Sequence, residues 1–201
     1  MTAGKMIRWA VRFLIWGWVG YALAGIWLRD LGASPAVELN HQMGEITLVL
    51  LTANLVLGMV LDVWRPLPRI LRLWVSERRF WGVSAFLVLV LHVFFYLLEQ
   101  GFEMQGLTQM VTKLYLIFGT LAFLILLMLA LTSNDWSVRK LRGKLWKRLH
   151  RAVYLAQSFI LAHVMLIEKT DLLKYGVWIG GLLILQGARG CWHVIRSRKN
   201  A

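Results

Sequence analysis

The sequence predicts an all-α integral membrane protein, a six-transmembrane-helix bundle with both termini in the cytoplasm. Three observations lead to this fold class. The 201 residues are 59% hydrophobic with a mean hydropathy of +0.62, which is too apolar for a soluble domain of this length. Several apolar stretches approach the roughly 20 residues that a helix needs to cross a bilayer. Positively charged segments alternate with segments that carry few cations, as expected for loops on opposite sides of a membrane.

Six stretches qualify as spans of a single transmembrane domain covering residues 1–201. They are residues 9–28, 43–64, 80–98, 113–132, 151–167 and 173–193. The fourth span is the clearest, because it contains LYLIFGTLAFLILLMLAL without a charged residue. The sixth is the weakest, because Lys174 and Arg189 near its two ends would have to extend toward the membrane surfaces.

The net charge of +13 follows the predicted topology. With the N-terminus in the cytoplasm, every Lys and Arg lies on the cytoplasmic side except Arg29, Lys113, Lys169 and Lys174. This is the distribution that the positive-inside rule predicts. A lipid bilayer as the partner therefore explains the charge. The distribution of the Lys and Arg residues argues against nucleic-acid binding.

The connections between the spans are too short to hold a second domain. Outer loops are expected at 29–42, 99–112 and 168–172, and inner loops at 65–79 and 133–150, with a proline-rich helix break at 65–68. No GxGxxG or Walker sequence is present. We therefore expect no nucleotide-binding domain in this chain.

Two histidines, His92 and His163, are the strongest candidates for chemistry inside the membrane. Each lies twelve residues from the inner end of its span, about 18 Å deep at 1.5 Å per residue. No Asp, Glu, Lys or Arg occurs in 80–98, 114–132 or 152–167, which argues against an ion transporter. Two neutral imidazoles at matched depth are what a haem with two axial histidines needs. The alternative is that each imidazole only packs and hydrogen-bonds to a neighbouring helix.

The third candidate, His150, lies at the inner end of the fifth span. On an ideal helix it would face a different direction from His163, thirteen residues later. It could ligate a second, inner haem, contact a flavin or quinone, or simply be solvated at the start of a basic helix.

The basic segment RKLRGKLWKRLHR is predicted to be a lipid-facing anchor or a docking surface for an acidic donor. His41 and His193 are predicted to be surface residues. The single cysteine, in Cys191-Trp-His193, does not form the CxxCH sequence that attaches a c-type haem.

Five stretches carry a resemblance to a known family. They are LGASPAVELNHQMGEITL (31–48), SERRFWG (76–82), LHVFFYLLE (91–99), LALTSND (129–135) and KLWKRLHRAVYL (144–155), followed by His163. With them the chain resembles the MsrQ family, the haem-binding membrane subunits of the bacterial periplasmic methionine-sulfoxide reductase system, within the ferric-reductase-like transmembrane superfamily. The resemblance implies haem b with His92 and His163 as axial iron ligands, and a functional inner-side His150. Arg78 stands where the superfamily has a further histidine, so only one complete histidine pair is visible and the number of haems, one or two, stays open.

The expected function is therefore electron transfer across the bacterial inner membrane. The donor would be a cytoplasmic flavin, such as FMN from a flavin reductase, or a membrane quinol. The resemblance implies a periplasmic molybdopterin methionine-sulfoxide reductase as the acceptor. Two alternatives remain: a self-contained haem reductase of ferric iron or oxygen, and a cofactor-free membrane scaffold or transporter.

Overall fold

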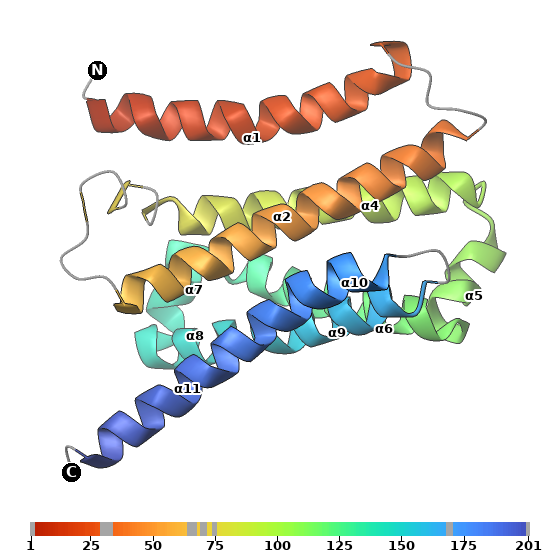
Figure 1. The fold of residues 1–201 in the computed structure, drawn as a ribbon. Coiled ribbons are helices and arrows are strands. Elements are labelled where there is room, and N and C mark those ends of the chain that lie inside the picture. The colour runs from red at the N-terminus through yellow and green to blue at the C-terminus, as the bar shows by residue number, and fades with distance from the viewer. Residues whose placement is uncertain are drawn as a thin grey trace. The chain divides into compact units, whose positions relative to one another are not determined.

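The computed structural model describes residues 3–28, 34–63, 68, 72–73, 76–167 and 171–199, and these form helices joined by short turns (Figure 1). No strand occurs in the part of the chain so described, which confirms the all-α prediction. The chain divides into two compact units, Met1–Leu107 and Thr108–Ala201. Each unit carries one of the two histidines predicted to lie deep in the membrane.

The first unit is built on a pair of long helices. Its elements are α1 (Ala3–Leu28), α2 (Pro35–Val63), α4 (Arg78–Glu99) and the start of α5 (Met104–Thr112). Helix α2 packs along α4, and α1 contacts α2. The residues that fill this core are spaced three, four or seven positions apart, as expected for packed helix faces: Val11, Ile15, Val19 and Ala22 on α1, Leu39, Met43, Ile46 and Leu50 on α2, and Trp81, Ala85, Val88 and Phe95 on α4.

Local sequence explains where the helices of this unit begin and end. Pro35 occupies the first position of α2, where a missing N–H costs no helical hydrogen bond. Helix α4 ends in a Schellman motif, in which the N–H of Gly101 donates to the carbonyl of Leu98 and the N–H of Phe102 to that of Leu97. Gly101 adopts a φ of 63° there, a value that glycine tolerates best.

The second unit is built on the pair formed by α6 and α9, with further helices around them. Its elements are α6 (Leu114–Leu131), α7 (Asp135–Lys140), α8 (Arg142–His150), α9 (Val153–Met165), α10 (Leu172–Tyr175), the π-helix η1 (Gly176–Gly180) and α11 (Gly181–Lys199). Helix α6 packs on α9, and η1 also contacts α9. Helix α7 starts at Asn134, whose side-chain oxygen accepts from the N–H of Ser137 at 2.8 Å as an N-cap.

Within the described residues, three of the six expected spans contain helices long and apolar enough to cross a membrane. They are Pro35–Met59, Arg78–Glu99 and Leu114–Leu131. Helices also occupy the other three positions: α1, the 13-residue α9, and η1 with α11. The six-span count and the cytoplasmic termini stay predictions.

The expected loops contain more helix than the sequence suggested. Helix α2 begins inside the loop predicted at 29–42, α5 fills most of 99–112, and α7 and α8 fill most of 133–150. The expected loops are more polar than the spans, but polar segments can also start helices. Pro35 is the first residue of α2, and Asn134 is the N-cap of α7. The predicted helix break at 65–68 lies outside the described residues apart from Pro68.

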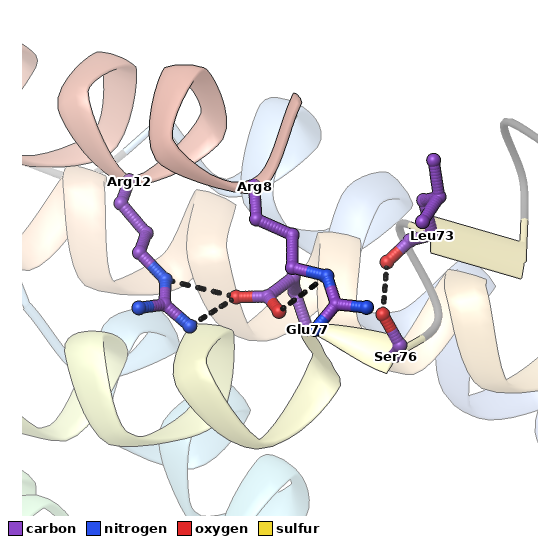
Figure 2. Close-up of polar contacts among 5 residues, drawn as sticks. All are labelled: Arg8, Arg12, Leu73, Ser76 and Glu77. Atoms are coloured by element: carbon purple, nitrogen blue, oxygen red, sulfur yellow. Dashed lines mark hydrogen bonds and ion pairs between the residues drawn. The ribbon is translucent and has the colours of Figure 1, made fainter. Parts of the chain in front are cut away.

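A buried carboxylate ties the first helix of the chain to the start of α4 (Figure 2). Glu77, whose side chain is only 6% exposed, accepts hydrogen bonds from Nε and Nη2 of Arg12 at 3.0 and 2.9 Å. Nε of Arg8 lies 3.8 Å from the other carboxylate oxygen. The Arg12 guanidinium also lies over the ring of Phe80, 4.9 Å from its centroid. These contacts fix the N-terminal half of α1 within the first unit.

Candidate functional site

His92 lies on α4 and is held by the facing helix α2. Its Nδ1 is 2.8 Å from the backbone carbonyl oxygen of Asn40. A carbonyl oxygen can only accept, so Nδ1 carries the proton and donates. In the neutral ring the lone pair then belongs to Nε2, which is the nitrogen available to a metal. The side-chain amide of Asn40 returns a hydrogen bond to the carbonyl of His92 at 2.7 Å, so the two residues are linked in both directions.

A glycine makes room for the His92 ring. If Gly44 carried a Cβ, that atom would lie 3.1 Å from Nδ1 and 3.2 Å from Cε1 of His92, closer than ordinary van der Waals contact. Gly44 follows Asn40 by one helical turn. On a helix surface, a backbone carbonyl lies beside the residue four positions later. A ring that hydrogen-bonds to the carbonyl of Asn40 therefore lies against Gly44.

The second unit repeats this arrangement around His163. The ring lies in the last turn of α9, with Nδ1 2.7 Å from the carbonyl oxygen of Tyr115 on α6. Gly119 stands one turn after Tyr115, and a Cβ there would lie 2.9 Å from Nδ1 of His163. The Tyr115 ring is also near, with its centroid 6.0 Å from that of His163. The same tautomer argument therefore assigns the lone pair of His163 to Nε2.

His150 is held differently, at the end of α8. Helices α8 and α9 are separate, because the N–H groups of Arg151, Ala152 and Tyr154 bond three residues back rather than four. The ideal-helix estimate of the angle between His150 and His163 was therefore based on the wrong local geometry.

The His150 ring is engaged by two neighbours within the second unit. It stacks on Trp146 with the ring centroids 3.9 Å apart, and its Nε2 is 3.2 Å from Oγ1 of Thr132. The Thr132 hydroxyl donates to the carbonyl of Met128 at 2.8 Å. The same hydroxyl also lies 3.2 Å from the carbonyl of Leu129, and which group donates in the contact with Nε2 depends on the tautomer of His150.

The arrangement around His92 and His163 is that of imidazoles prepared for a metal. Metal-bound histidines usually donate their second ring N–H to a carbonyl or carboxylate, which fixes the ring and raises the basicity of the ligating nitrogen. Within the described residues no group of three or more His, Cys, Asp or Glu side chains could form a metal site of its own. Each imidazole, taken by itself, therefore has the supported geometry of a metal ligand.

Comparison with known proteins agrees with this chemistry. Residues 38–162 match the family described as the ferric reductase like transmembrane component. The chain is 34% identical to the protein-methionine-sulfoxide reductase heme-binding subunit MsrQ of Rhodospirillum rubrum, over 86% of this chain and 80% of the relative. It is 35% identical to the MsrQ subunit of Azospira oryzae, over 88% of this chain and 73% of that relative. The chain belongs to the MsrQ family. No solved structure gives a significant match.

The segment shared with the ferric-reductase-like proteins contains most of the site of this MsrQ-family chain. His92, His150, Gly44 and Gly119 lie within residues 38–162, and His163 follows one residue after the match ends. His41 is exposed on α2, as predicted for a surface residue, and the side chain of His193 lies outside the described part of the chain.

Arg78 occupies a position related to that of His92 in the first unit. It precedes His92 by fourteen residues on α4, and it faces Gly58, which follows Gly44 by fourteen residues on α2. A Cβ on Gly58 would lie 2.8 Å from Nη2 of Arg78, and Nε of Arg78 donates to Oδ1 of Asn54 at 3.3 Å. A guanidinium therefore stands at this glycine in place of an imidazole.

The sequence predicted the three histidines as candidate site residues but not the groups that hold them in the structure. Asn40, Gly44, Tyr115 and Gly119 were not predicted as site residues. A glycine in a helix interior costs about 1 kcal/mol relative to alanine. Gly44 and Gly119 could therefore have been recognised as points of close approach, although their partners could not.

Proposed function

We propose that this chain is the haem b-binding membrane subunit of a methionine-sulfoxide reductase system. It would span a bacterial inner membrane as one six-helix domain and conduct electrons from a cytoplasmic flavin or quinol donor to a periplasmic molybdopterin reductase. The observation that carries the proposal is the matched pair of His92 and His163, each with Nδ1 bonded to a backbone carbonyl. The names of the two MsrQ relatives, as heme-binding subunits of a protein-methionine-sulfoxide reductase, support both the cofactor and the reductase partner.

In this proposal His92 and His163 would hold the haem iron through Nε2 of each ring. The haem would supply one-electron redox chemistry. The protein fixes both ring tautomers through the carbonyls of Asn40 and Tyr115, and it keeps ionisable side chains out of the surrounding spans. Helices α6 and α9 contain no Asp, Glu, Lys or Arg, and α4 contains none between its first turn and its last residue. Little side-chain charge therefore competes with the charge of the iron.

His150 is proposed to act where electrons enter rather than as a ligand to a second haem. Its Nε2 contacts the hydroxyl of Thr132, and its ring is stacked on Trp146. Helix α8 adds exposed cations around this stack, among them Lys144, Lys147 and Arg148. An aromatic pair on a cationic surface suits the planar ring and phosphate of FMN, or a flavin carried by an acidic donor.

Absorption spectra of the purified protein test the proposal. The protein is expressed with ample haem supply, purified in detergent, and measured when oxidised and when reduced with dithionite. We expect the sharp reduced bands of a b-type haem with two histidine ligands. A colourless protein would contradict the proposal and favour a cofactor-free scaffold. A coloured protein that passes electrons rapidly to ferric chelate or oxygen, and not to a methionine-sulfoxide reductase, would favour the self-contained reductase.

Replacing His150 by alanine is expected to leave the haem spectrum and the haem-to-protein ratio unchanged. The reason is that His150 is engaged by Thr132 and Trp146 and is not needed to hold the iron. The same variant in proteoliposomes should accept electrons from reduced FMN more slowly than the wild type. Loss of half of the bound haem in His150→Ala would instead show a second haem with His150 as a ligand.

A further inference from the structure

We propose that Gly44 and Gly119 are positioning residues that set the redox potential of the bound haem by holding the rings of His92 and His163 against backbone carbonyls. This inference rests on the proposed function, since it takes the two histidines as iron ligands. It adds two residues without side chains, each of which faces one of the two imidazoles. Each acts only through the imidazole that it faces.

The contact distances show that only glycine leaves these rings where they are. A Cβ at position 119 would stand 2.9 Å from Nδ1, 3.2 Å from Cε1 and 3.5 Å from Cγ of His163. Three ring atoms are involved, so the whole imidazole would have to move. At position 44 the corresponding distances to Nδ1 and Cε1 of His92 are 3.1 and 3.2 Å, which a displacement of a few tenths of an ångström would relieve.

Moving either ring weakens the hydrogen bond that fixes its tautomer. The bonds from Nδ1 to the carbonyls of Asn40 and Tyr115 are short, at 2.8 and 2.7 Å. The carbonyl and the glycine are one helical turn apart on the same face, so a methyl group on the glycine pushes the ring away from that face. The hydrogen bond to Asn40 or Tyr115 therefore lengthens in the alanine variant.

The electronic consequence has a definite sign. An Nδ1–H that donates to a carbonyl makes Nε2 a stronger electron donor, which favours ferric over ferrous iron. Weakening the bond favours the ferrous state and raises the midpoint potential. We expect a larger upward shift for Gly119→Ala than for Gly44→Ala, because the clash at position 119 is the closer one.

The chain offers matched glycine-to-alanine controls in both units. Among the described residues, a Cβ added at Gly20 on α1 or at Gly181 on α11 would have no atom within 4 Å beyond the adjoining backbone of its own helix. Gly58 on α2 would meet only the flexible guanidinium end of Arg78. All three substitutions change helix propensity in the same direction as those at 44 and 119, but they touch no imidazole.

The experiment measures midpoint potentials of the five alanine variants and the wild type by potentiometry on the reduced haem bands. Electron paramagnetic resonance of the oxidised samples reports the ring orientations independently. Raised potentials and altered g-values in Gly119→Ala and Gly44→Ala, with Gly20→Ala, Gly58→Ala and Gly181→Ala unchanged, would support the proposal. Unchanged potentials at both positions, or equal shifts in all five variants, would overturn it. If the Gly119→Ala protein does not accumulate in the membrane, the midpoint potential of Gly44→Ala alone tests the proposal.

Two further results separate this inference from the proposed function. A wild-type protein without haem contradicts the proposed function itself. A haem-containing wild type with unshifted Gly44→Ala and Gly119→Ala variants contradicts only the positioning role. In ¹⁵N-histidine spectra of the haem-free protein, the Nδ1–H tautomer at His163 should weaken in Gly119→Ala and persist in Gly181→Ala, and an unaltered tautomer at His163 would also count against the inference.

Discussion

Alanine at either His92 or His163 is expected to remove most of the haem from the purified protein. Each substitution deletes one proposed ligand of the iron. Disturbing a group that only supports a ligand typically lowers the affinity for the metal about 10–100-fold. The loss of haem affinity on deleting the ligand itself should be larger. The loss should be similar for the two variants, because each histidine is held by the same kind of carbonyl and glycine pair. The measurement is the haem-to-protein ratio, together with the height of the reduced b-type bands.

His41→Ala is the matched control for this prediction. His41 is exposed on α2, one residue from the Asn40 carbonyl that holds His92, and the structure gives it no place in the site. Its substitution should leave the haem content unchanged. Normal haem content in His92→Ala or His163→Ala would show that the ligand assignment is wrong for that residue, and the imidazole would then be a packing group.

The sequence allowed the histidines to be predicted as candidate site residues, but not the groups that surround them. His92 and His163 stood out because a titratable side chain is rare within an apolar span and therefore informative. Their acceptors did not, because every residue has a backbone carbonyl and no letter of the sequence marks the one at Asn40 or Tyr115. The pairing of α2 with α4, and of α6 with α9, selects those carbonyls, and it depends on packing between segments distant in the sequence.

The local fold was also only partly predictable. Hydrophobic length identified the cores of α2, α4 and α6, because about 20 apolar residues leave few alternatives. It did not predict the interruption between α8 and α9, where the basic and apolar parts of KLWKRLHRAVYL are each compatible with a continuous helix. The prediction assumed one continuous helix from His150 to His163, whereas α8 ends at His150, whose ring stacks on Trp146.

Replacing Arg12 by methionine is expected to lower the thermal stability of the protein. Methionine keeps much of the apolar stem but leaves the 6%-exposed Glu77 carboxylate without its two closest donors. Breaking a fully buried ion pair costs about 3–5 kcal/mol. Because the Arg12 side chain is 37% exposed, we expect roughly 1–3 kcal/mol here. For a chain of this size each 1 kcal/mol corresponds to about 2–4 °C in Tm.

Arg8→Met provides the matched comparison, because it removes the same charge from the same helix. Arg8 is 47% exposed and lies 3.8 Å from Glu77, a geometry typical of surface pairs worth about 0–1 kcal/mol. Apparent Tm values in detergent should therefore fall in the order wild type, Arg8→Met, Arg12→Met. Glu77→Gln should lie above Arg12→Met, because it removes the buried charge and leaves two arginines that water can reach. Equal Tm values for Arg8→Met and Arg12→Met would mean that α1 is held by its apolar face, through Val11, Ile15 and Val19, and that the buried carboxylate contributes little.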